Sequence, residues 1–414
     1  MPHTLAIVGG GASGLCAAVF AAQSGGFSEI ILLERGPRVG RKLLATGNGR
    51  CNLTNRHFSR GNYHGADPAF TEPAFSAFGL EETLAFFESL GILFHVEPDG
   101  RVYPRSLQAA SVLDALRLEA DRLGVTTRCG CEVTALRRRR DGFSLSLAGG
   151  EEIAADAVLI AAGGPASPKL GGTDAGSRLL AALGHKTGTL LPSIVQLKTD
   201  TAPIKPLAGI KFEGTATLLD GGRPLRSEAG EILFTEYGLS GPPILQLSCT
   251  ATHLLEERGS RPEIALDLFP EYDRKALSSL LYRRVYARPE AELSHFLLGL
   301  VHRRLGETAI KAAGIAPLSR RADSLSRQEL AALTALLKGW TLAVTGTTGL
   351  ANAQATAGGV LTKDFDPETL ESRLVPGLYA CGEVLDIDGD CGGFNLQWAW
   401  SSAMLAVSAM LERG

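Results

Sequence analysis

The chain has 414 residues, 45% of them hydrophobic, which is enough for two or three domains with cores of their own. Its net charge of −3 gives no reason to expect nucleic acid or an anionic membrane as a partner, and no apolar stretch reaches the length of a bilayer span. The seven cysteines form an odd set without a C-x-x-C pair, which is typical of reduced cytosolic thiols and argues against bound metal. We therefore expect a cytoplasmic globular protein.

The N-terminal segment Leu5–Ala22 predicts a buried strand, a G-x-G-x-x-G turn and an alanine-rich helix. Gly9 permits the tight turn, Gly11 lets the backbone approach a pyrophosphate, and Gly14 lets the helix press against the strand. The start of the helix offers unpaired N–H groups to anionic oxygens. This pattern predicts a dinucleotide phosphate site.

A second strand, Glu29–Arg35, places a carboxylate where the ribose of such a dinucleotide would lie. Glu34 follows Gly14 by twenty residues and stands at the end of this strand, so it can accept hydrogen bonds from ribose hydroxyls. The next loop, 35–55, combines cations, small residues and amides, which suits a long bent cofactor and favours FAD over NAD. The strand and glycine turn at 377–386 supply a second anchor from the far end of the chain.

The first 185 residues alternate strands and helices, as in a mainly parallel sheet covered by helices. Helices are expected over 80–90 and 109–123, with a hairpin over 94–104. Strands are expected over 125–133, 143–147 and 156–165, and the last of these ends in glycines that allow close approach to the cofactor.

From about residue 190 to residue 360 the pattern changes to short strands separated by turns, the first of them expected over 192–197, with a helical stretch inside the region. The expected fold is α/β: a Rossmann-like FAD-binding domain interrupted by a β-rich, barrel-like insertion that carries a small helical subdomain. The expected boundaries are 1–188 with 357–414 for the FAD-binding domain, 189–270 with 339–356 for the β-rich insertion, and 271–338 for the helical subdomain.

The tail from Gly382 couples an acidic glycine loop to a helix that begins near Gly393. The positive end of that helix would stabilise the negative charge of a reduced flavin without a titrating side chain. Arg41, Lys42 and Arg50 are candidate phosphate partners, and Cys51 is interpreted as a small buried neighbour of the ring rather than a redox thiol. No general acid is assigned, because no spacing singles one out among the polar candidates His185, Tyr237, Glu383, Asp386, Asp388 and Asp390.

Four motifs together resemble a known family: residues 8–14, 40–55, 234–242 and 382–399. The chain resembles the BaiN-type NAD(P)/FAD-dependent oxidoreductases, which include aminoacetone oxidase-like flavoproteins, over nearly its whole length. The resemblance implies FAD held by a Rossmann-like domain, with a β-rich insertion and a helical subdomain. One departure is Asn48, where relatives usually carry glycine. The motifs and the resemblance together predict these cofactor contacts: Gly9, Gly11, Ala12, Ser13, Gly14, Glu34, Arg35, Arg41, Lys42, Thr46, Gly47, Asn48, Asn52, Val133, Ala162, Gly163, Gly382, Glu383, Gly393, Asn395 and Leu396.

Three functions remain open from the sequence. The first is an FAD-dependent reductase that moves hydride from transiently bound NAD(P)H through flavin N5 to an unsaturated or carbonyl-conjugated small molecule. The second is an FAD-dependent oxidase of a small amine that uses oxygen. The third is a flavin-holding accessory protein, or one linked to RNA modification, and the near-neutral charge counts against RNA.

Overall fold

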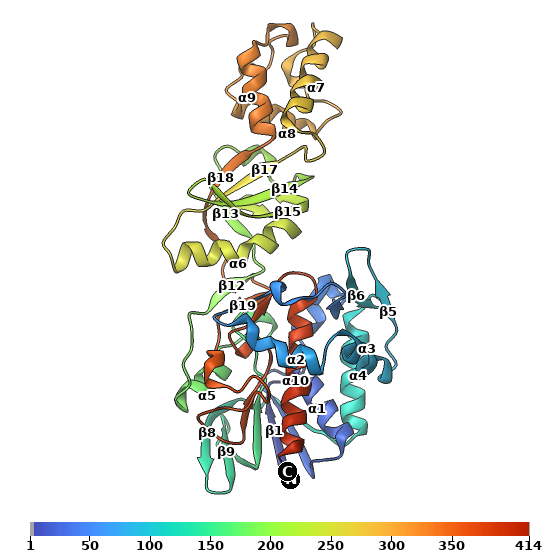
Figure 1. The fold of residues 1–414 in the computed structure, drawn as a ribbon, viewed down its shortest axis with the longest axis vertical. Coiled ribbons are helices and arrows are strands. Elements are labelled where there is room, and N and C mark those ends of the chain that lie inside the picture. The colour runs from blue at the N-terminus through green and yellow to red at the C-terminus, as the bar shows by residue number, and fades with distance from the viewer. Residues whose placement is uncertain (1–3, 414) are drawn as a thin grey trace. The chain divides into compact units, whose positions relative to one another are not determined.

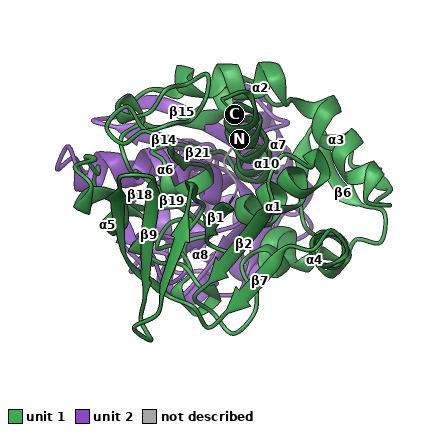
Figure 2. Cartoon of the chain, turned by 90° about the horizontal axis from the view of Figure 1, so that it is seen from below, with its two compact units in different colours: residues 1–193, 353–414 green, residues 194–352 purple. Residues whose placement is uncertain are grey.

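The computed structural model describes residues 4–413 and divides the chain into two compact units. Unit 1 comprises residues 1–193 and 353–414, and unit 2 comprises residues 194–352 (Figures 1 and 2). Unit 1 is thus assembled from both ends of the chain. The three-part division expected from the sequence, with its boundaries at 188 and 357, stays a prediction.

A five-stranded parallel sheet forms the centre of unit 1, in the order β20-β11-β1-β2-β7. Its strands are β1 (Thr4–Val8), β2 (Glu29–Glu34), β7 (Thr126–Cys129), β11 (Ala157–Ile160) and β20 (Leu378–Ala380). The strands β1 and β11 are continuous apolar runs, which is the pattern of a sheet buried on both faces. The expected Rossmann-like α/β architecture is confirmed.

Two long helices bring the ends of the chain together in unit 1. Helix α1 (Ala12–Ser24) packs against α10 (Phe394–Glu412) and α4 (Ala109–Arg122). Helix α10 is buried over most of its length, and Trp398 and Trp400 are fully buried. The C-terminal helix therefore reaches the glycine turn that follows β1.

The remaining elements of unit 1 are short. The helices are α2 (Glu72–Ala77), α3 (Leu80–Ser89) and α5 (Ala175–Ala182). The small sheets are β3 (Thr54–Asn55) with β6 (Arg101–Pro104) and β5 (Phe94–Val96), β4 (Tyr63–His64) with β21 (Asp388–Gly389), β12 (Leu191–Ser193) with β19 (Ala355–Ala357), and the antiparallel β8 (Val133–Arg139), β9 (Gly142–Leu147) and β10 (Glu152–Ala155). The 3-10 helices of unit 1 are η1 (Leu43–Gly49), η2 (Arg60–Asn62), η3 (Pro68–Thr71), η4 (Pro168–Leu170), η8 (Thr362–Asp364) and η9 (Gly382–Val384).

Unit 2 contains a closed six-stranded barrel, as expected from the short strands of the insertion. Its strands follow the order β13 (Leu197–Thr199), β16 (Gly238–Ser240), β15 (Arg223–Phe234), β14 (Lys211–Asp220), β17 (Glu263–Asp267) and β18 (Trp340–Thr347). Alternate residues of β14, β17 and β18 are buried, so that one face of each strand fills the core. The helices are α6 (Pro242–Glu256), α7 (Arg274–Ala287), α8 (Arg303–Ala312) and α9 (Arg327–Leu337), with η5 (Lys205–Leu207), η6 (Leu293–His295) and η7 (Ala322–Ser324).

The structure corrects three local expectations. The strand expected over 125–133 is two strands, because the chain turns at Gly130, which has a φ of 71°. The strand expected from Pro192 to Leu197 is also two, and β12 pairs with β19 in unit 1. Helix α6 was missed, because its sequence lies among strands and opens with two prolines, which are accepted at the start of a helix.

Candidate functional site

The turn between β1 and α1 is held by the acid at the end of β2. Glu34 Oε2 accepts a hydrogen bond from Gly10 N (2.9 Å), and Oε1 accepts one from Gly36 N (2.5 Å). Each carboxylate oxygen has a further lone pair to offer. Glu34 thus joins two glycine turns and can still accept ligand hydroxyls.

Two glycines at the start of α1 differ in their surroundings. A Cβ on Gly14 would overlap the carbonyl oxygen of Gly9, so the helix can approach the strand only with glycine there. A Cβ on Gly11, the N-cap, would meet no atom within 4 Å. Gly11 therefore leaves open space beside the N–H groups of the first turn, where an anion can approach.

The loop after β2 carries two consecutive residues in the left-handed region. Gly47 has a φ of 57° and Asn48 a φ of 56°. Asparagine tolerates this conformation better than other non-glycine residues. Asn48 therefore supports a backbone path that glycine would also allow.

One ion pair joins this loop to the C-terminal part of unit 1. Lys42 Nζ donates to Glu383 Oε1 (3.0 Å) and Oε2 (2.8 Å), and Glu383 Oε1 also accepts from Thr356 N (2.7 Å). The two side chains are 28% and 21% exposed. A positive and a negative charge, 341 residues apart in sequence, thus face the same cavity.

The N-terminus of α10 presents polar groups beside this loop. Asn395 Nδ2 donates a hydrogen bond to Gly389 O (2.7 Å), and Asn395 Oδ1 accepts one from Gly389 N (3.0 Å). Asn52 Oδ1 is buried, and within residues 4–413 it has no hydrogen-bond partner. An unpaired buried acceptor is costly unless a ligand donor completes it.

These features fit FAD. The first turn of α1 suits its diphosphate, Glu34 suits a ribose, and Asn52 Oδ1 suits an N–H donor such as the imide of the flavin ring. Arg50, by contrast, pairs with Glu97 (2.9 Å) and lies over the Tyr103 ring at 4.4 Å, so it supports the β5–β6 hairpin instead.

The structure brings most of the predicted contacts to one cavity of unit 1. The predicted residues that line it are Gly9, Gly11, Ala12, Ser13, Glu34, Arg41, Lys42, Thr46, Ala162, Gly163, Glu383, Asn395 and Leu396. A second cavity shares Gly9, Glu34 and Ala162 and adds Arg35 and Val133. Outside both linings lie Gly14, Gly47, Asn48, Asn52, Gly382 and Gly393.

Other lining residues were not predicted. They are Gly10, Arg38, Gly40, Leu43, Ala161, Gly164, Leu170, Gly171, Gly172, Gln354, Ala355, Trp398 and Ala399. Many of them adjoin predicted residues, so the motifs themselves could have indicated them. Leu170–Gly172 and Gln354–Ala355 belong to segments without a nucleotide motif.

The polar candidates for proton transfer are dispersed. His185 is buried, with Nδ1 against Leu180 O (2.9 Å) and Nε2 against Ser372 Oγ (2.7 Å), which indicates a structural role. Tyr237 lies in unit 2 and is 38% exposed. Among these four candidate acids, Glu383 lines the main cavity, whereas Asp386, Asp388 and Asp390 are buried in and around β21.

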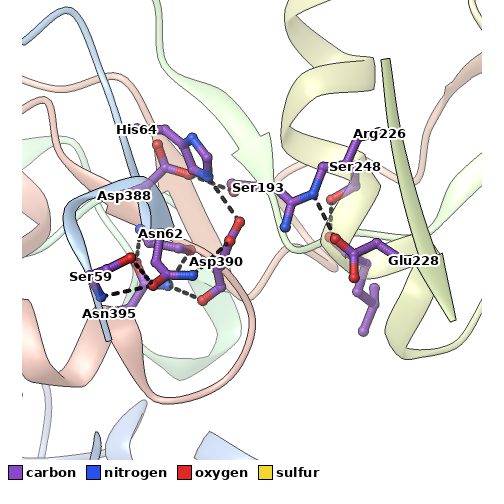
Figure 3. Close-up of polar contacts among 12 residues, drawn as sticks. Ser59, Asn62, His64, Ser193, Arg226, Glu228, Ser248, Asp388, Asp390 and Asn395 are labelled. Atoms are coloured by element: carbon purple, nitrogen blue, oxygen red, sulfur yellow. Dashed lines mark hydrogen bonds and ion pairs between the residues drawn. The ribbon is translucent and has the colours of Figure 1, made fainter. Parts of the chain in front are cut away.

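His64 adjoins no sequence motif, and the fold brings it to the acidic loop at 386–390. His64 Nε2 lies 2.9 Å from Asp390 Oδ1, Asn62 Nδ2 donates to Asp390 Oδ2 (3.4 Å), and Ser193 Oγ donates to Asp388 Oδ2 (2.8 Å) (Figure 3). Strand β4 pairs with β21 here. The contact between His64 and Asp390 therefore supports the loop at 388–390, in which Gly389 binds the side chain of Asn395.

The cysteines differ sharply in accessibility. Burial raises the pKa of Cys51 and of Cys381 to about 12, because a thiolate is poorly solvated there, whereas Cys129 is exposed. At pH 8 a thiol with a pKa near 12 is ionised in only about one molecule in 10,000. We expect iodoacetamide at pH 8 to modify Cys129 first and to leave Cys51 and Cys381 intact, as read by peptide mass spectrometry.

The control for this labelling is the urea-unfolded protein, in which all seven cysteines should react. Raising the pH from 7 to 9 should accelerate labelling of Cys129 while Cys51 stays unmodified. Labelling of Cys51 at the rate of Cys129 in the folded protein would contradict the burial described here.

Two structural features are absent from the described range. Residues 4–413 contain no group of three or more His, Cys, Asp or Glu side chains arranged to hold a metal ion. Over the same range, no helix combines the length and the apolar character that crossing a bilayer requires.

A parallel sheet with a glycine turn after β1, an acid at the end of β2 and a cavity at the helix start defines the Rossmann class of nucleotide-binding proteins. The model of the HI0933-like protein Rossmann domain matches residues 3–409. The chain belongs to this family, and the resemblance stated from the sequence is confirmed. It is an FAD-dependent oxidoreductase.

Three known proteins illustrate the similarity. The chain is 39% identical over 411 residues to a 3-dehydro-bile acid delta(4,6)-reductase of Clostridium scindens, covering 99% of this chain and 100% of the relative. It is 31% identical over 400 residues to a ribosomal RNA dihydrouridine synthase of Escherichia coli, covering 96% and 95%. The structure of 3-ketosteroid delta1-dehydrogenase from Sterolibacterium denitrificans aligns over 100% of both chains with a TM-score of 0.53 and 12% identity, which shows a shared fold.

Proposed function

We propose that this protein is a cytoplasmic FAD-dependent reductase that uses NAD(P)H to saturate a carbon–carbon double bond conjugated with a carbonyl group in a small molecule. The observation that carries the proposal is the full-length similarity to a reductase of 3-dehydro-bile acids. The names of both curated relatives describe a gain of hydrogen, by a bile acid in one case and by uridine in the other. A cytoplasmic location is supported by seven free thiols.

The shared chemistry of such substrates explains what the site must do. A carbonyl group withdraws electrons from the conjugated double bond, so the far carbon accepts hydride and negative charge develops on the oxygen. Donors fixed in advance beside that oxygen stabilise the charge. FAD, when bound, supplies the hydride through flavin N5.

The residues predicted from the sequence are proposed to hold FAD in the cavity of unit 1. The N–H groups at the start of α1 would bind the diphosphate, and Glu34 would accept from a ribose. Lys42 Nζ forms an ion pair with Glu383 Oε2 (2.8 Å) and lines the cavity. The N-terminus of α10 adds positive potential where Asn395 lies.

The test is an anaerobic visible spectrum of the FAD-loaded protein with NADH or NADPH, followed by addition of a 3-oxo-Δ4 steroid or cyclohexenone. We expect the flavin band near about 450 nm to bleach with one nucleotide and to return when the enone is added. Bleaching by aminoacetone with peroxide release in air would replace this proposal with an amine oxidase. A band unaffected by nucleotide, enone and amine would reject both.

Reduction of uridine in ribosomal RNA is a second candidate, favoured by the 31% identity that extends over 96% of this chain. The C5–C6 double bond of uracil is also conjugated with a carbonyl, so the same site chemistry applies. Incubation of the FAD-loaded protein with NAD(P)H and ribosomal RNA should then produce dihydrouridine, measured by nucleoside mass spectrometry. No dihydrouridine under conditions that reduce an enone would exclude this candidate.

A further inference from the structure

The charge of the chain is unevenly distributed. Residues 271–338 contain twelve lysines and arginines against seven aspartates and glutamates, a net charge of +5 in a chain whose total is −3. The rest of the chain therefore carries −8. The small net charge of the whole chain is therefore the sum of a basic segment within unit 2 and an acidic remainder.

Within residues 271–338, the highest density of positive charge lies on α7. From Arg274 to Arg288 the sequence holds five basic residues and no acid. Leu277 and Leu281 are fully buried and fix the helix to the core of unit 2, with α9 as its packing partner (Figure 1). The basic residues thus belong to a helix whose orientation is set by its apolar side.

The opposite side of α7 is a surface that we call the α7 face, defined by Lys275, Ser279, Arg283 and Tyr286. These positions share one side of the helix because they are spaced by four, four and three residues. All four are exposed, and Tyr286, at 81%, is the most exposed large hydrophobic side chain of the described residues.

The two cations of the α7 face form no ion pair with any residue in the range 4–413. Arg284 is engaged, since its guanidinium donates to Phe296 O and Leu298 O (both 2.8 Å). For Lys275 and Arg283, no side-chain hydrogen bond or ion pair is found with any residue in the range 4–413. Elsewhere in this segment, by contrast, Arg303, Arg320 and Arg321 pair with Glu307, Glu329 and Asp323.

We propose that the α7 face binds RNA, with Lys275 and Arg283 on phosphates and Tyr286 stacked on an unpaired base. Phosphate contacts supply most sequence-independent affinity, and exposed aromatic rings stack bases without reading them. An anionic membrane would need an exposed apolar face, but Leu277 and Leu281 of α7 are buried and Leu280 packs against the core of unit 2. An acidic protein offers carboxylates but no base to stack on Tyr286. An RNA partner was not expected from the overall net charge of −3.

The test is fluorescence anisotropy of a labelled RNA stem-loop with a uridine-rich loop, titrated with FAD-loaded protein at several salt concentrations. We expect Lys275→Ala with Arg283→Ala to weaken binding at least tenfold and to reduce the slope of log affinity against log salt by about 1.4 to 1.8, since two phosphate contacts are lost. Tyr286→Ala should weaken binding about tenfold, and Tyr286→Phe should bind as the parent protein does.

The matched control is Arg137→Ala with Arg140→Ala, which removes the same charge from exposed arginines of unit 1. An equal loss from both pairs would overturn the proposal, as would binding of phosphatidylserine vesicles without binding of RNA. Because the assay reads binding and not turnover, absence of RNA binding would leave enone reduction by the same protein standing. Absence of enone reduction would likewise leave RNA binding standing.

Discussion

Replacing Gly11 by alanine is expected to weaken FAD binding by about ten- to a hundredfold while leaving the protein folded. Gly11 has a φ of −83° and a ψ of −163°, which alanine also adopts, and its Cβ would meet no atom within 4 Å. The added methyl group would stand in the cavity at the N-terminus of α1, where the diphosphate must approach the backbone. Loss of a glycine N-cap should cost less than about 1 kcal/mol in stability.

The matched variant is Gly14→Ala, which makes the same chemical change one helical turn later. Its Cβ would overlap Gly9 O, so the backbone must move, and we expect the free energy of unfolding to fall by about 3 kcal/mol. Flavin fluorescence titration and urea unfolding of the FAD-free protein separate the two effects. Equal FAD affinity in Gly11→Ala and the parent protein would show that this turn does not hold the cofactor.

The ion pair between Lys42 and Glu383 predicts opposite effects from its two partners. In Lys42→Met, Glu383 would face the anionic cofactor without its partner, and we expect the affinity for FAD to fall about tenfold. In Glu383→Gln, Lys42 would keep its charge and the amide could still accept from Thr356 N, so affinity should stay equal or rise.

The double variant Lys42→Met with Glu383→Gln removes both charges and serves as the control. We expect its FAD affinity to lie between those of the two single variants, because neither of the two positions then leaves an unpaired charge. Titration at low and high salt should show the largest salt dependence for Glu383→Gln, whose cation is then unpaired. If Glu383→Gln bound FAD more weakly than Lys42→Met, the order of the two affinities would be the opposite of that expected from charge, and the electrostatic explanation would be rejected.

Much of the fold could be predicted because its signals are local. The glycine turn after β1, Glu34 at the end of β2 and the hairpin of β5 with β6 each follow from short patterns of residues. The change to short strands after residue 190 correctly predicted a barrel. Alternating hydrophobicity and turn residues carry this information over stretches of about ten residues.

Elements whose assignment depends on distant partners were harder to predict. Helix α6 lies among strands and opens with two prolines, and β12 pairs with β19, which lies some 160 residues away. His64 adjoins no recognisable motif, and only the pairing of β4 with β21 brings it to Asp390. Leu170–Gly172 and Gln354–Ala355 reach the cavity through loops whose sequences carry no nucleotide pattern.

The sequence by itself determined the class of this protein, because phosphate binding requires glycines and a helix start at fixed spacing, and this spacing is visible in the chain. The basic residues of α7 are also visible in the sequence, although acidic residues elsewhere in the chain outweigh them in the net charge. Only the tertiary structure decided which charges meet and which stay exposed. Lys42 and Glu383 are paired because they follow the carboxyl ends of β2 and β20, two parallel strands of one sheet. Lys275 and Arg283 are exposed because Leu277 and Leu281 turn the other side of α7 into the core.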